Sequence, residues 1–180
     1  MKKIFIILGL SSGLAIFAQN NPIDGTENIH IFNDKANHTL ELHYTLFTVN
    51  PTTCGGGFQA QGPSIILPPG GLTDYKTFES STTAAAHPYP IDNWFNGNII
   101  PAASITPAMA YNERWAYMKF QLRDPQNPGN IPLLSGSVGY YQNCTGAQPH
   151  ISDSGTLNGV TYSFFAEAFT VGTDLWINVQ

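Results

Sequence analysis

The sequence predicts an all-β fold, an antiparallel β-sandwich of about 8 to 10 strands, with a β-barrel as the alternative. Four observations lead to this prediction. Several segments alternate apolar and polar residues with period two, which is typical of strands with one buried face. The 17 glycines and 13 prolines supply turn signals between these segments. No segment beyond residue 18 has the apolar periodicity of a helix of normal length, and two distant cysteines can form one disulfide.

The amino terminus has the pattern of a secretory signal peptide. Lys2 and Lys3 precede an uncharged, mostly apolar run over residues 4–17, and Ala18 precedes a polar stretch. The run of about 14 residues is shorter than the ~20 that a membrane-spanning helix needs. We therefore expect a signal peptide over residues 1–18 and a single β domain over 19–180. This predicts a secreted or periplasmic protein without a membrane span.

The charge balance argues against one class of partner. Removal of the predicted signal peptide leaves five basic residues against twelve acidic ones, a formal charge of −7. Such a chain has little with which to neutralise phosphates, so we expect no nucleic-acid partner. The basic residues that remain are Lys35, Lys76, Arg114, Lys119 and Arg123.

The two cysteines, Cys54 and Cys144, are predicted to form a disulfide. An even number of cysteines in an exported chain favours a bridge over a reactive thiol or a metal pair, which remain the alternatives. Both lie in turn-like sequence, "TTCGGGF" and "YQNCTGAQ", at the ends of predicted strands. The three glycines after Cys54 are interpreted as residues that give the loop its backbone freedom.

The first half of the domain contains two predicted hairpins. Segments 28–33 and 38–49 flank the short gap "DKAN", and segments 64–67 and 72–78 flank the turn "PPGG". Residues 79–109 then form one long irregular connection with repeated prolines. Connections of this length are uncommon in compact domains unless they are functional, or shortened by small strands or helical turns.

The second half has clearer strand signals. Segment 113–123 alternates strictly, "DPQNPGN" predicts a turn, and a strand runs over 133–141. Asn158-Gly159 is the strongest hairpin signal in the chain, and residues 174–180 form the last strand. The apolar faces of the predicted strands should form the core, with Leu40, Leu42, Leu46, Met118, Phe120, Leu122, Tyr162, Phe164, Ile177 and Val179.

The aromatic residues suggest a ligand-binding surface. Strict alternation in segment 113–123 places Trp115 and Tyr117 on the outer face with Lys119, Gln121 and Arg123, and Trp176 is placed outward on the last strand. Trp94 lies in a loop beside Asn93 and Asn96. Exposed rings bordered by neutral hydrogen-bonding groups suit a carbohydrate, since sugars present patches of C–H beside hydroxyls. The alternative is that these rings belong to the core. The surface also requires that the strands ending at Arg123 and Gln180 are neighbours.

Catalytic and metal-binding patterns are weak. His38 and His43 are five residues apart and would point to opposite faces of one strand, so with His30 they do not predict a metal site. Glu41, Glu79, Glu113 and Glu167 could supply a glycosidase pair only at a separation of about 5 to 10 Å. We expect no metal and no cofactor. The function predicted is an exported, non-enzymatic module that binds a carbohydrate or a cell-surface ligand. The alternatives are a structural or adhesive surface protein and, less favoured, a small secreted hydrolase.

Overall fold

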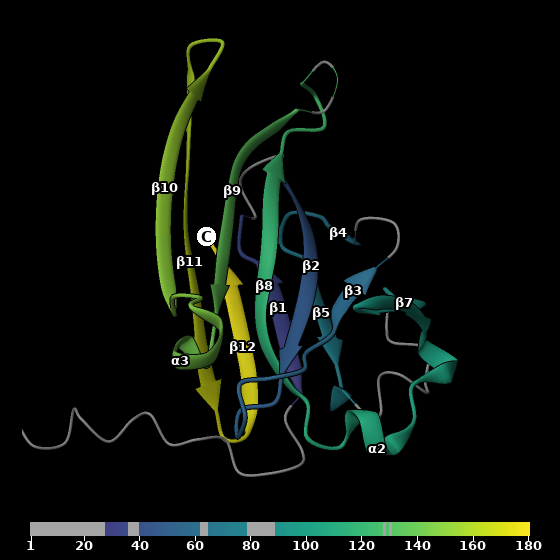
Figure 1. Cartoon of the computed structure of the whole chain (residues 1–180). Helices are drawn as coiled ribbons and strands as arrows, with labels where there is room; N and C mark the ends of the chain where they lie inside the picture. The colour runs from purple at the N-terminus through teal and green to yellow at the C-terminus, as the bar shows by residue number, and fades with distance from the viewer. Residues whose placement is uncertain (1–27, 36–39, 62–64, 79–88, 128, 130) are drawn as a thin grey trace, which may run out of the picture.

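Two β-sheets packed face to face form the body of the protein (Figure 1). The structure is a computed structural model, and it describes residues 28–35, 40–61, 65–78, 89–127, 129 and 131–180. The predicted signal peptide, residues 1–18, lies outside the described residues. Within them, no helix is long and apolar enough to cross a membrane.

The first sheet, sheet A, has five strands in the order β10-β11-β12-β1-β5. Their bounds are β10 His150–Leu157, β11 Val160–Val171, β12 Asp174–Val179, β1 Ile29–Asn33 and β5 Leu72–Tyr75. Neighbouring strands are antiparallel except β1 and β12, which run parallel with Ile29 opposite Leu175. The sandwich is therefore antiparallel apart from this one pair.

The second sheet, sheet B, has seven strands, six of them in the order β7-β6-β3-β2-β8-β9, while β4 also pairs with β2. Their bounds are β7 Asn98–Pro101, β6 Asn93–Asn96, β3 Gln59–Gln61, β2 Glu41–Val49, β8 Arg114–Arg123, β9 Pro132–Gly139 and β4 Ile65–Leu67. Short helices in the described part of the chain connect strands: η1 Ala102–Ser104, α2 Pro107–Ala110 and α3 Gln142–Thr145.

The core lies between the two sheets and is built from the inward positions of the alternating strands. Phe120 of β8 packs edge-on against Phe164 of β11, with ring centroids 5.1 Å apart. The buried hydroxyls of Tyr44 and Tyr75 lie 3.2 Å apart and link sheet B to sheet A. Nine of the ten predicted core residues are buried, and the exception, Tyr162, packs half-buried against the same core.

The two hairpins predicted in the first half of the domain are wrong. β1 belongs to sheet A, whereas β2 belongs to sheet B. In the same way β4 pairs with β2 of sheet B, and β5 pairs with β1 of sheet A. Each of these connections crosses from one sheet to the other. Alternation marks which side chains point inward, but it does not say which sheet a strand joins.

The hairpin at Asn158-Gly159 is confirmed. β10 and β11 pair with Leu157 opposite Val160, and both turn residues have positive φ, 52° at Asn158 and 79° at Gly159. Two positive φ values are the requirement of a type I′ turn, whose twist matches that of the flanking strands. The antiparallel pairing of β8 with β9 around the predicted turn "DPQNPGN" is also observed.

The connection predicted as irregular contains regular structure in its described part. β6 and β7 form a hairpin with Asn96 opposite Asn98, and η1 and α2 follow. Residues 79–88 of the connection lie outside the described residues. The hairpin extends sheet B beyond β3, since Trp94 of β6 pairs with Ala60.

The disulfide between Cys54 and Cys144 is confirmed, with Cα atoms 4.8 Å apart. It joins the loop after β2 to the helix α3. Positive φ values at Cys54, Gly56 and Gly57 show why the loop contains adjacent glycines. At Gly57 a Cβ atom would also lie only 2.8 Å from the carbonyl oxygen of Thr48.

Candidate ligand-binding groove

The outer face of sheet B, which points away from the core, carries a row of polar and aromatic side chains. Outward positions on β2 are Glu41, His43, Thr45 and Phe47, and the residues opposite them on β8 are Arg123, Gln121, Lys119 and Tyr117. The next strand, β9, places Ser135 and Ser137 in register with Gln121 and Lys119. The face is thus continuous over three strands.

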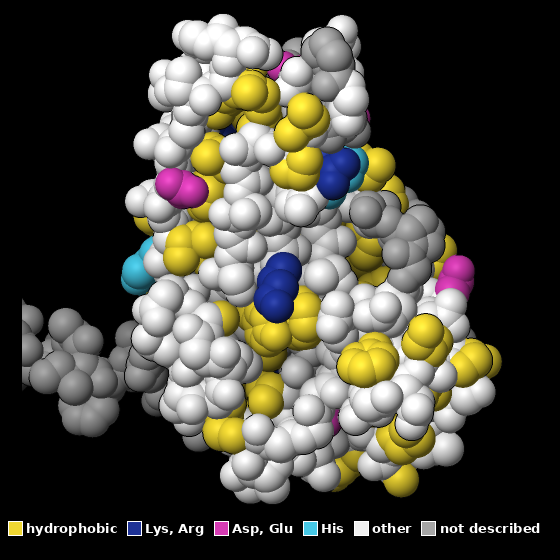
Figure 2. Space-filling view, turned by 45° about the horizontal axis from the view of Figure 1, so that its top comes forward, with side chains coloured by type: hydrophobic (Ala, Val, Ile, Leu, Met, Phe, Trp, Pro, Cys, Tyr) yellow, Lys and Arg dark blue, Asp and Glu magenta, His cyan; other side chains and the backbone are white. Residues whose placement is uncertain are grey.

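This face is hollowed into a groove, the site we consider functional. A cavity of about 560 Å³ lies over β2, β8 and β9 and is bounded on the other side by Gln59–Gln61 and residues 90–92. His43 and Phe47 point away from the core, yet only 7% and 9% of their surface is exposed. Figure 2 shows the hollowed face, with a dark blue basic side chain over yellow apolar side chains near its middle.

Several polar side chains in the groove are available to a ligand. Gln59, Gln61, Ser135 and Ser137 line the cavity, and their side chains form no hydrogen bond with other described residues. Two amides and two hydroxyls offer both donors and acceptors without a net charge. By contrast, the hydroxyl of Thr45 donates a hydrogen bond to the carbonyl of Ala60 at 3.0 Å.

An aromatic pair borders this polar part of the groove. Phe47 and Tyr117 occupy opposite positions on β2 and β8, and their rings stack with centroids 4.2 Å apart and planes inclined by 7°. A smaller pocket of about 290 Å³ lies between this pair, the glycine loop and the β6–β7 turn. Its lining includes Phe95, Asn96 and Gly97.

Lys119 is the cation of the groove. Its Nζ lies 5.1 Å from the centroid of the Phe47 ring, and its side chain is exposed. The groove also contains Asp92, and His43 at 3.1 Å from the carboxylate of Glu41.

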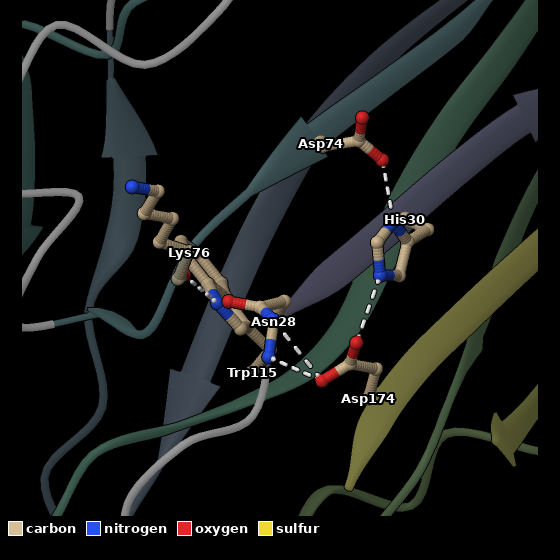
Figure 3. Close-up of polar contacts among 6 residues, drawn as sticks. All are labelled: Asn28, His30, Asp74, Lys76, Trp115 and Asp174. Atoms are coloured by element: carbon tan, nitrogen blue, oxygen red, sulfur yellow. Dashed lines mark hydrogen bonds and ion pairs between the residues drawn. The ribbon is translucent and has the colours of Figure 1, made fainter. Parts of the chain in front are cut away.

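Two of the tryptophans predicted to contact a ligand are buried, so their predicted exposure is wrong. Trp94 has 0% and Trp115 has 2% of its surface exposed. Phe78 packs edge-on against both rings, at 4.8 Å and 5.7 Å between centroids. The indole N–H of Trp115 donates to the carbonyl of Lys76 at 2.8 Å, as Figure 3 shows.

A β-bulge explains the position of Trp115. Phe47 lies opposite Tyr117, and the next residue of β2, Thr48, lies opposite Trp115. Ala116 is therefore an extra residue on β8, and from this point the alternation along the strand is reversed. Tyr117 keeps the predicted outward position, whereas Trp115 turns into the core.

The remaining predicted site residues fall on two different faces. Tyr117 and Asn96 meet at the smaller pocket of sheet B. Asn93 lies on the same sheet, opposite Gln61. Trp176 lies on sheet A, because β12 pairs with β11 and β1 and not with β8. It is on the outer face, since it alternates with the buried residues of β12. The single aromatic surface predicted from the sequence is therefore divided.

Trp176 belongs to a separate polar cluster, shown in Figure 3. Its ring stacks on His30 with centroids 4.2 Å apart, and His30 contacts the carboxylates of both Asp74 and Asp174. Partial burial favours a raised pKa for Asp174, but hydrogen bonds from His30 and Asn28 outweigh it and lower the pKa. The cluster ties together β5, β1 and β12.

The glutamates considered for a glycosidase pair are dispersed. Glu41 and Glu113 lie at opposite ends of the β2–β8 ladder, roughly 25 Å apart for eight strand residues. Glu167 lies on sheet A, and Glu79 lies outside the described residues. The separation of Glu41 from Glu113 exceeds the ~5 to 10 Å that this chemistry uses. His30 and His43 lie on different sheets, and His38 lies outside the described residues.

The sequence prediction missed most residues of the groove. Phe47, Gln59, Gln61, Ser135 and Ser137 were not identified as candidates. A signal existed for the two serines, since they alternate with Leu134, Gly136 and Val138 in a strand-like run. Gln59 and Gln61 belong to a three-residue strand, which is too short to show a periodic pattern.

Comparison with known proteins gives no further indication of the role of this groove. The chain matches no protein-family model, no curated protein and no solved structure.

Proposed function

We propose that the protein binds a carbohydrate chain in the groove on the outer face of sheet B. The observation that carries this proposal is the groove itself. It places amide and hydroxyl side chains, which have no hydrogen-bond partner among the described residues, next to a stacked aromatic pair. Sugar rings present hydroxyls around their edges and C–H groups on their faces. Neutral donors and acceptors next to aromatic carbon are complementary to both.

The dimensions of the groove support a ligand longer than one sugar. The larger cavity, at about 560 Å³, falls within the range of about 300 to 1,000 Å³ that is usual for small-molecule sites. The smaller pocket shares Phe47 and Tyr117 with the face of β2 and β8, so the two hollows follow the same strands.

The proposal includes export of the protein from the cytoplasm. Disulfides persist in oxidising compartments, and the bridge between Cys54 and Cys144 closes the loop next to the smaller pocket. The signal-like amino terminus agrees with this compartment. Carbohydrate chains are abundant outside cells, so the compartment and the ligand class fit together.

Binding to immobilised and soluble saccharides tests the proposal. The purified protein should be screened on a glycan array, and a binding saccharide should then be titrated by calorimetry. Tyr117→Ala should weaken binding by about two- to tenfold, since the contacts of one aromatic ring are worth about 0.5 to 1.5 kcal/mol.

The matched control is Trp176→Ala, which removes an aromatic ring from the outer face of sheet A. This variant should bind as the unaltered protein does. Equal losses in both variants, or a loss confined to Trp176→Ala, would contradict a site on sheet B.

A further inference from the structure

We infer that the saccharide bound in the groove is acidic, with its carboxylate or sulfate group held by Lys119. This inference rests on the proposed function and specifies the class of ligand. Lys119 lies on the middle strand of the β2-β8-β9 face and lines the larger cavity. Its neighbours across the two strands are Thr45 and Ser137.

Hydrogen bonds to other protein groups distinguish three of the basic residues, Lys35, Arg114 and Arg123, from Lys119. Lys35 is buried and donates to the carbonyl of Ser163, Arg114 donates to the carbonyls of Tyr111 and Glu113, and Arg123 donates to Gln121. Among the described residues, Lys119 forms no ion pair and no hydrogen bond, and its one polar interaction is with the Phe47 ring. Its ammonium group keeps its donors for a ligand.

The contact with Phe47 positions the ammonium group. A lysine side chain lays its alkyl stem along apolar surface and keeps its charged end in water. The ring face of Phe47 attracts the cation over this distance. The ammonium is therefore held over the groove instead of extending into bulk solvent.

The other charges around the groove leave this position favourable for an anion. The carboxylate of Glu41 contacts the ring of His43, and Glu41 lies at the end of β2, opposite Arg123 of β8. Asp92 lines the cavity from the opposite wall. The hydroxyl of Ser137, unpaired among the described residues, lies beside Lys119 and can donate to the same anionic group. The anion should thus bind along β8 and β9, away from Asp92.

The test compares acidic and neutral polymers of related sugars. Polygalacturonate carries carboxylates, a sulfated galactan carries sulfates, and an unsubstituted galactan carries neither. The unaltered protein should bind at least one acidic polymer about tenfold or more tightly than the neutral one, because a hydrogen bond to a charged group is worth about one factor of ten. The preferred acidic polymer identifies carboxylate or sulfate as the group recognised. Binding should weaken as the salt concentration rises.

Two variants at one position make the test specific. Lys119→Gln removes the charge and should reduce the affinity for the acidic polymer to that for the neutral one, while Lys119→Arg should retain most of the preference. Both should unfold at nearly the temperature of the unaltered protein, because the side chain is exposed. Unchanged acidic binding in Lys119→Gln overturns the inference, and so does equal binding of acidic and neutral polymers by the unaltered protein.

The outcomes also separate this inference from the proposed function. If neutral and acidic saccharides bind equally well, and both bind more weakly to Tyr117→Ala, the proposed function stands and this inference fails. If neither these polymers nor any saccharide on the glycan array binds, both fail.

Discussion

Trp115 fills the space between the two sheets at the end of β8 and uses its polar atom there. Its ring lies 5.8 Å from Tyr75 and 6.0 Å from Trp94 between centroids. A buried indole N–H without a partner is costly, and the carbonyl of Lys76 satisfies this one. Trp115 is therefore a residue of stability and not of ligand contact.

Trp115→Ala should lower the free energy of unfolding by about 3 to 5 kcal/mol, the usual cost of deleting a large buried aromatic ring. Denaturant unfolding of the variant and the unaltered protein measures this difference. Trp176→Ala, on the outer face of sheet A, should cost clearly less. A loss below about 1 kcal/mol in Trp115→Ala would mean that the ring is not enclosed as described.

A buried carboxylate organises the loop between β2 and β3. The hydroxyl of Thr48 donates to Glu113 at 2.6 Å and accepts from the backbone N–H of Phe58 at 2.9 Å. The N–H of Gly57 lies 3.4 Å from the other carboxylate oxygen. Burial is the largest effect on this group, and it raises the pKa of Glu113 above the ordinary value of 4.5.

This raised pKa predicts a pH dependence of stability. A carboxyl with a raised folded-state pKa binds its proton more tightly in the folded protein than in the unfolded chain. Its contribution to the free energy of unfolding is therefore complete below about pH 4.5 and is lost as the pH rises through the folded-state pKa. Glu113→Gln has no titrating group at this position, so it does not lose this stability as the pH rises. The unfolding free energy of the variant, relative to the unaltered protein, should therefore increase with pH above 4.5, by at most about 1.4 kcal/mol per pH unit.

Chemical denaturation at a series of pH values measures this slope. Glu167→Gln, which removes a carboxylate on β11 outside the loop, is the matched control. Parallel profiles for Glu113→Gln and the unaltered protein would show that Glu113 is not the titrating group.

The bulge in β8 limits what the sequence predicts about the direction of the side chains of this strand. Period-two alternation correctly places Met118, Phe120 and Leu122 inward and Tyr117 outward. It fails at Trp115 because an extra residue in one strand is visible only against its partner. Next to the bulge, a glycine is required at position 139 of β9, because a Cβ atom there would lie 2.2 Å from the Cβ of Tyr117.

Strand pairing has the same limit. The Asn158-Gly159 hairpin is predictable because its signal is local, whereas β1 pairs with β12 from the other end of the chain. A candidate site that spans several strands depends on such distant pairings. Tyr117 and Asn96 were identified from sequence, but their meeting at one pocket follows from the position of β6 beside β3.

The two outer faces of the sandwich differ in character. The outer face of sheet B is hollowed and mostly polar, with amides and hydroxyls that form no hydrogen bond within the described part of the chain. The outer face of sheet A carries exposed aromatic side chains on β11, Phe165 and Phe169, beside the cluster of His30 and Trp176. We propose the carbohydrate site on sheet B because a cavity there coincides with hydrogen-bonding groups that have no partner among the described residues.

Titration of the isotope-labelled protein with a binding saccharide, followed by backbone-amide NMR, tests this assignment most directly. The largest shifts should fall on β2, β3, β8 and β9, including the amides of Gln61, Lys119 and Ser137, and the amides of β11 and β12 should change little. Shifts concentrated on sheet A around Phe169 and Trp176, with the amides of sheet B unchanged, would contradict this assignment.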